Sequence, residues 1–214
     1  MQDGEFSTRA SEWRTRYRGQ NALWRGLMLR WALTSVLTVA CCTPAFAVSS
    51  PEPRSEPVSE YQVRALFLYN FAKFVDWPPS SFASAQDPFT ICIVGDDPFG
   101  SELDQAVRGK FTNGRHIVIK RVVTGKDARS CQIAFISYPD ERRLKKALEE
   151  LNSSSVLTVG GAKGFAEWGG VVNFALESNK VGFEINVDAA EHSQLKISSK
   201  LLNLAKAVVR RGKD

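Results

Sequence analysis

A stretch of alternating residues, 169–187, constrains the fold more than any other part of this sequence. Apolar side chains recur with period two on both sides of Ser178-Asn179, as expected of a β-hairpin with a two-residue turn. With that turn, one face carries three cross-strand apolar pairs. These pairs are Val172 with Ile185, Phe174 with Phe183, and Leu176 with Val181. The central aromatic pair is expected to fix the register.

The other face of the hairpin is polar. Asn173 lies opposite Glu184 in the same register, Asn186 follows, and the neighbouring pair Ala175 and Gly182 is small. Such a cluster is either a solvated outer surface or a buried, hydrogen-bonded set. The small neighbours favour burial, because they let a helix approach closely. A buried Glu184 could act as a base, but a structural carboxylate held by amides and backbone donors is the expected role.

An export signal precedes the predicted folded region. Arg25 and Arg30 come before an apolar run at 31–40, and Ala45-Phe46-Ala47 supplies a small-x-small cleavage site. The apolar run is too short for a stable membrane-spanning helix. We therefore expect 1–47 to be an extension plus a cleaved signal peptide, 48–59 a linker, and 60–211 one domain. The mature protein would be exported, with no membrane insertion after cleavage. Translation from Met28 and lipidation of Cys41 are left open.

Cleavage changes what the composition indicates. Residues 1–47 hold six of the 28 basic and three of the 23 acidic side chains, so 22 basic side chains remain against 20 acidic ones. Without a basic stripe, nucleic-acid binding has no support. Cleavage also removes Cys41 and Cys42. The remaining pair, Cys92 and Cys131, indicates a disulfide in an oxidising compartment, and two buried free thiols are the alternative.

The rest of the chain alternates between helical and extended patterns. Helices are predicted at 60–77, 102–107, 140–151 and 199–209, and strands at 89–94, 117–123, 132–136 and 156–159. The first helix would turn inward Val63, Leu66, Phe67, Phe71 and Phe74, and the last Leu201, Leu204, Ala205 and Val208. Leu68, Tyr69 and Ala72 widen the apolar band of the first helix, which is either well buried or meets a partner with its extra apolar side. This order predicts a single α/β domain with a mixed sheet, parallel in its first half, that ends in the hairpin and a helix.

Residues typical of catalysis are scarce. Asp96 and Asp97 follow the first strand, and Asp97 before Pro98 resembles a helix N-cap. The alternative is a ligand or metal site at the carboxyl edge of the sheet. No second ligand cluster accompanies the aspartates, so no metal or cofactor is predicted. His116 and His192 show no spacing to a nucleophile. The residues alone indicate an exported binding domain and not an enzyme.

Four stretches in order, together with the Cys92/Cys131 spacing, resemble the YfiR-like periplasmic regulators. They are 61–74 (YQVRALFLYNFAKF) followed by Trp77-Pro78, 92–99 (CIVGDDPF), 169–174 (GGVVNF), and 181–190 (VGFEINVDAA) leading into 195–199 (LKISS). The resemblance implies a six-stranded sheet flanked by helices. It further implies a protein that binds and represses the periplasmic sensor domain of an inner-membrane diguanylate cyclase, which lowers cyclic-di-GMP output.

The same resemblance implies further partners and residue roles. An outer-membrane OmpA-like lipoprotein would remove the repressor, and the redox state of the cysteines would matter. A hydrophobic partner-binding surface would fall at Val187, Ala190, Ile197 and Leu202. Some relatives have a second cysteine pair, where this chain has Ala166 and Asn173, so one bridge is expected. The alternative is a module that binds a small ligand near Asp96, Asp97 and Glu184. A homodimer is left open.

Overall fold

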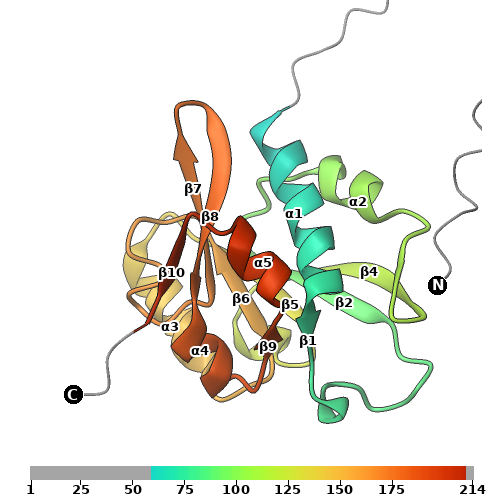
Figure 1. The fold of residues 1–214 in the computed structure, drawn as a ribbon. Helices are drawn as coiled ribbons and strands as arrows, with labels where there is room; N and C mark the ends of the chain where they lie inside the picture. The colour runs from blue at the N-terminus through green and yellow to red at the C-terminus, as the bar shows by residue number, and fades with distance from the viewer. Residues whose placement is uncertain (1–58, 211–214) are drawn as a thin grey trace, which may run out of the picture. The chain divides into compact units, whose positions relative to one another are not determined.

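An eight-stranded mixed sheet forms the centre of residues 59–210, the part of the chain that the computed structural model describes (Figure 1). The strand order is β10-β8-β7-β6-β5-β2-β4-β3. The strands are β2 (Phe89–Gly95), β3 (Phe111–Thr112), β4 (Arg115–Val122), β5 (Ile133–Ser137), β6 (Leu157–Gly160), β7 (Val172–Glu177), β8 (Lys180–Asn186) and β10 (Ala207–Val209). The expected signal peptide and most of the expected linker lie outside the described residues.

The sheet is mixed, as predicted, but it has two more strands than the six implied. Strands β4, β2, β5, β6 and β7 run parallel to one another, and β8 is antiparallel to β7. The two additional strands are short edge strands. One, β3, pairs antiparallel with β4, and the other, β10, pairs parallel with β8. Neither has enough residues to show a period of its own.

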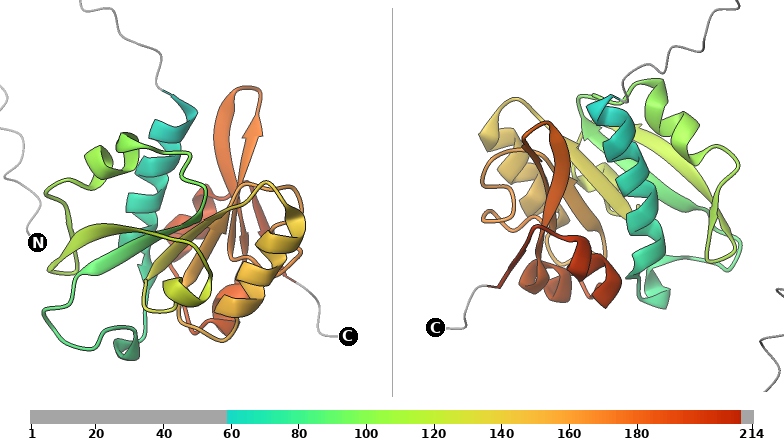
Figure 2. Two further views of the ribbon diagram at one scale, coloured as in Figure 1. Left: turned by 180° about the vertical axis from the view of Figure 1, so that it is seen from behind. Right: turned by 45° about the horizontal axis from the view of Figure 1, so that its top comes forward.

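Helices cover both faces of this sheet (Figure 2). Helix α1 (Glu60–Phe74) packs beside α2 (Ser101–Val107) and α5 (Ser199–Leu204) in the larger hydrophobic core. Helix α3 (Glu141–Leu151) packs on the opposite face in a second, smaller core, near the short helix η2 (Lys126–Ala128). A two-stranded sheet joins β1 (Val75–Asp76), at the end of α1, to β9 (Lys196–Ile197). The short helix η1 (Pro79–Ser81) follows β1 in sequence, and helix α4 (Val187–His192) precedes β9.

The buried face of α1 agrees only in part with the one predicted: Phe71 is buried and Phe67 packs against the core, but the buried face is rotated away from Leu66. Its buried residues are Arg64, Ala65, Leu68, Phe71 and Ala72, while Leu66 is 50% exposed. The helix is apolar over most of its circumference, so its periodicity does not distinguish the inward side. It begins at a capping box formed by Ser59 and Gln62. It ends at Phe74 and not at 77, because Val75 enters β1.

The hairpin is confirmed with the predicted register. Asn173 pairs with Glu184, Phe174 with Phe183, and Leu176 with Val181. Ser178 and Asn179 have φ values of 48° and 63°, which are those of a type I′ turn. The rings of Phe174 and Phe183 pack against Phe67 and Phe71 of α1. The hairpin and the first helix therefore share one aromatic core.

The predicted final helix is too long. Helix α5 ends at Leu204, and the chain then becomes extended at Ala205 and forms β10 beside β8. The N–H of Lys206 donates to the carbonyl of Phe183 at 2.9 Å, which begins this pairing. Leu204 and Val208, predicted to point inward, are 64% and 47% exposed. The spacing of these apolar residues favours a helix, but residues 207–209 pair with the distant strand β8 instead.

Candidate functional site

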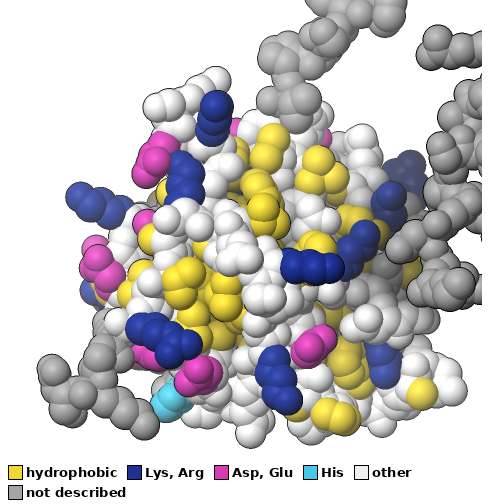
Figure 3. Space-filling view, viewed as in Figure 1, with side chains coloured by type: hydrophobic (Ala, Val, Ile, Leu, Met, Phe, Trp, Pro, Cys, Tyr) yellow, Lys and Arg dark blue, Asp and Glu magenta, His cyan; other side chains and the backbone are white. Residues whose placement is uncertain are grey.

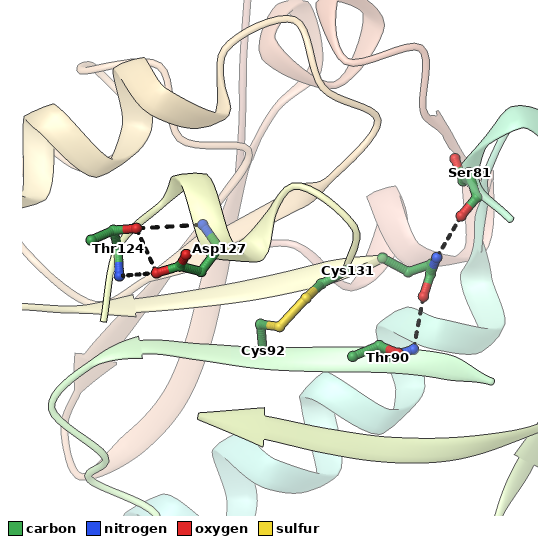
Figure 4. Close-up of a disulfide and its surroundings, with 7 residues drawn as sticks. Ser81, Thr90, Cys92, Thr124, Asp127 and Cys131 are labelled. Atoms are coloured by element: carbon green, nitrogen blue, oxygen red, sulfur yellow. Dashed lines mark hydrogen bonds between the residues drawn. A yellow bond between two sulfur atoms is a disulfide. The ribbon is translucent and has the colours of Figure 1, made fainter. Parts of the chain in front are cut away.

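The disulfide predicted from the cysteine count is present between Cys92 and Cys131, with Cα atoms 6.0 Å apart (Figure 4). Cys92 lies within β2, and Cys131 lies two residues before β5, which pairs with β2 in parallel. Both residues are buried. The bridge therefore links β2 to the chain that enters the neighbouring strand β5, on the α3 face of the sheet.

Gln132 connects the chain on both sides of this bridge. Its side-chain oxygen accepts the N–H of Thr90 at 2.7 Å, and its side-chain nitrogen donates to the carbonyl of Ser81 at 2.7 Å (Figure 4). Its backbone carbonyl accepts the indole N–H of Trp77 at 2.9 Å. This buried amide thus ties the start of β2 to η1 and β5. Sequence reasoning gave it no role.

A depression of about 550 Å³ lies beside the disulfide, at the amino ends of the parallel strands. Its lining includes Cys131, Gln132 and several hydroxyl side chains. It also includes two cationic side chains, those of Lys120 and Arg129. The segments that form it are widely separated in sequence. Sequence reasoning missed this site, although the parallel pairing of Lys120 with Cys92 places both side chains on one face of the sheet.

The two aspartates after β2 have different surroundings. Asp97 accepts the N–H groups of Phe99 and Gly100 at 2.8 and 3.3 Å and pairs with Arg121 at 2.7 Å. The hydrogen bonds that Arg121 donates to the carboxylates of Asp104 and Asp97 raise its pKa. Asp97 is not the cap of α2, because Gly100, with a φ of 54°, places one more turn before Ser101. Asp96 is exposed.

The polar face of the hairpin is largely buried, as predicted. Asn186 caps α4 by accepting the N–H of Ala189 at 3.0 Å, and it donates to the carbonyl of Ala166 at 2.8 Å. Asn173 is also buried, and its side-chain oxygen makes no hydrogen bond within the described part of the chain. Glu184 is partly exposed.

The small pair Ala175 and Gly182 is expected from the sequence to let a helix approach, but the neighbour at Gly182 is a lysine side chain. A Cβ at Gly182 would lie 2.3 Å from the Cε of Lys206, so the space that the glycine leaves holds a lysine side chain. Lys206 continues along the hairpin to an ion pair with Glu177 at 2.7 Å. Gly182 therefore leaves room for the side chain of Lys206, in the segment that leads into β10.

These polar residues do not form one ligand crevice. Four strand spacings separate β8, which carries Glu184, from β2, which precedes Asp96 and Asp97. At about 4.8 Å per spacing this is roughly 19 Å, too far for one small pocket. Of these polar residues, Asn186 lines a depression in the described part of the chain. That second depression, of about 300 Å³, also includes Trp168 and His192.

The residues expected to bind a partner are less exposed than an interaction surface requires. Val187 and Ala190 are buried, and Ile197 and Leu202 are partly buried. Greater exposure occurs at Leu66 of α1 and Leu204 of α5, two helices that contact each other. Hydrophobic side chains gather over α1 and beside α5 on this face (Figure 3). We call Leu66, Phe67, Leu202 and Leu204 the α1–α5 surface.

Residues 59–210 contain neither a metal-binding cluster nor a membrane-spanning helix. No group of three or more His, Cys, Asp or Glu side chains in that region could hold a metal ion. No helix among the same residues is long and apolar enough to cross a membrane.

The fold and the bridge define a mixed-sheet α/β domain with one disulfide that links β2 to the chain entering β5. The YfiR/HmsC-like family model matches residues 61–206, and the chain belongs to this family. No curated protein matches it in sequence.

Solved structures give distant similarities. A conserved domain protein from Vibrio cholerae O1 biovar El Tor is 12% identical, with a TM-score of 0.48, over 71% of this chain. An ABC domain from Streptococcus pneumoniae, described in complex with L-Trp, is 12% identical, with a TM-score of 0.44, over 70% of this chain. The matched region spans 60% of each of those two proteins.

Proposed function

We propose that the protein is a non-enzymatic periplasmic regulator. It binds the periplasmic domain of an inner-membrane diguanylate cyclase and represses it, which lowers cyclic-di-GMP signalling and biofilm formation. The observation that carries the proposal is the family match across residues 61–206. An outer-membrane OmpA-like lipoprotein would compete for the regulator and release the cyclase. The disulfide would hold the binding-competent form.

The α1–α5 surface is the proposed docking site. Leu66 and Leu204 are 50% and 64% exposed, so covering them with a partner would remove apolar area from water. Ile197 and Leu202 are half-buried and pack against the larger hydrophobic core. Val187 and Ala190 are buried within that core. Exposed apolar residues of this kind mark interaction sites when they gather on one face.

A capture experiment tests this docking site. Tagged protein would be incubated with detergent-solubilised envelopes of the same organism, in oxidised and reduced forms, and retained proteins identified by mass spectrometry. We expect the oxidised wild type to retain a membrane diguanylate cyclase. The double variant Leu66→Asp/Leu204→Asp should lose it, because a charge on each leucine opposes burial against the partner.

The matched control is Val123→Asp, which places the same charge on an apolar residue that is 71% exposed and lies after β4. Thermal melts of all variants establish that each is folded. Equal retention of the cyclase by the double variant and the wild type would rule out the α1–α5 surface. Failure of the oxidised wild type to retain any cyclase would reject the proposed function.

A further inference from the structure

The depression beside the disulfide has the size of a small-molecule site. Its volume of about 550 Å³ falls within the roughly 300–1,000 Å³ typical of ligand pockets. It lies at the amino ends of β2, β5 and β6, on the face that α3 covers beside β5 and β6. Seen from behind, that face has no helix in front of β2 and β4 (Figure 2).

Two cations in the lining form no ion pair within the described part of the chain. Lys120 stands beside Cys92 in the parallel register, so it points to the face that carries the disulfide. Within the described residues, the side chain of Arg129 makes one hydrogen bond, from its Nε to the carbonyl of Glu150 at 2.7 Å, which leaves its other N–H groups for a ligand.

The one carboxylate in the lining is already bound to its own loop. Asp87 accepts the N–H groups of Ala83 and Ser84 at 2.8 and 3.0 Å and the hydroxyl of Ser84 at 2.7 Å. The hydrogen bonds from Ser84 lower the pKa of Asp87. The carboxylate of Asp87 is therefore hydrogen-bonded within the loop 83–87. Because the lining holds two cations and one carboxylate, its net charge is positive.

Hydroxyl groups supply most of the remaining polar lining. They belong to Ser80, Ser81, Thr90, Ser130, Ser154 and Ser155. The Ser81 hydroxyl is buried and makes no hydrogen bond to the described residues, whereas the Ser154 hydroxyl donates to the carbonyl of Leu151. Cations bind an anionic group, and neighbouring hydroxyls that both donate and accept suit the hydroxyls of a sugar.

We propose that this depression binds a small polyhydroxylated anion, of the sugar acid or sugar phosphate class. Lys120 and Arg129 would hold the carboxylate or phosphate, and the serine hydroxyls would hold the ring hydroxyls. The site lies on the α3 face, whereas the α1–α5 surface lies on the face that carries α1. Binding at the depression therefore stands or falls independently of the proposed cyclase repression.

Isothermal titration of the purified oxidised protein tests this site with three probes. Glucuronate and glucose 6-phosphate carry the two anionic groups, and glucose is the uncharged control. We expect saturable binding of at least one anion and much weaker binding of glucose. Lys120→Gln removes a charge without removing a hydrogen bond among residues 59–210. It should weaken anion binding roughly 10- to 100-fold, which is what a hydrogen bond to a charged group contributes.

A matched control separates the site from general charge effects. Lys146→Gln removes an exposed lysine on α3 and should leave the affinity unchanged. Arg129→Gln provides a second test, with thermal melts to check folding. Absence of saturable binding for both anions would overturn the proposal. Equal affinity of wild type and Lys120→Gln, or equal binding of glucose and the anions, would overturn it as well.

Discussion

Removing the Cys92–Cys131 bridge should lower the free energy of unfolding by about 4 kcal/mol or more. The two cysteines are 39 positions apart, and the chain-entropy relation assigns ~4 kcal/mol at 25 °C to closing a loop of about 40 residues. Both residues are buried, so alanine at each position also leaves a small void, which costs roughly 1 kcal/mol apiece. The double variant Cys92→Ala/Cys131→Ala should therefore lose about 4–6 kcal/mol.

Urea unfolding at 25 °C measures this loss. The parent would carry Cys41→Ser and Cys42→Ser, so that only the bridge responds to reductant. We expect the oxidised parent to unfold at the highest midpoint. The double variant should also show a steeper dependence on urea, because its unfolded chain is no longer cross-linked and exposes more surface. Its melting temperature should fall by about 12–18 °C, at about 3 °C per kcal/mol for a domain of this size.

The reduced parent distinguishes the two contributions. Reduction opens the loop but keeps both sulfur atoms in the core, so the reduced parent should lie between the oxidised parent and the double variant. Adding reductant to the double variant should change nothing. If the oxidised parent and the double variant differ by less than 1 kcal/mol, the reasoning from loop closure is wrong for this fold.

Two further substitutions test the interior. Gln132→Ala should cost about 2–3 kcal/mol in urea unfolding, because it leaves the buried N–H of Thr90 and the carbonyl of Ser81 without their partner. Gln105→Ala, which removes only an exposed hydrogen bond to Ser101, is the control and should stay within about 0.5 kcal/mol. Gly170→Ala should cost about 1–3 kcal/mol, since its Cβ would lie 2.1 Å from the buried ring of Phe165. A Gly170→Ala midpoint equal to that of the wild type would show that this ring moves freely.

The hairpin could be predicted because its information is local. Alternation with period two, a turn at Ser178-Asn179 and one aromatic pair determine which residues face each other, and the structure has that register. The disulfide followed from the count of cysteines and the expected compartment. The inward face of α1 could not be predicted in the same way. Its apolar residues surround the helix, and packing against the sheet selects Arg64 and Leu68 over Leu66.

The remaining differences depend on contacts between distant segments. Strand β10 forms because the chain after Leu204 meets the free edge of β8, and no pattern within 199–209 encodes that edge. The depression beside the disulfide combines loops at 80–88, 129–132 and 154–155 with Lys120 of β4. Only the strand order brings these segments together. Asp97 is predicted to cap the helix because Pro98 follows it. The helix α2 begins only at Ser101, after a turn at Gly100, so Asp97 does not cap it.

Cellular cyclic-di-GMP is the measurement that tests the proposed function most directly. It would be determined in the parent organism, in a deletion strain, and in that strain complemented with wild type, Leu66→Asp/Leu204→Asp or Val123→Asp. The account predicts that deletion raises cyclic-di-GMP and that wild type and Val123→Asp restore the low level, whereas the double variant does not. An unchanged cyclic-di-GMP level in the deletion strain would contradict the account.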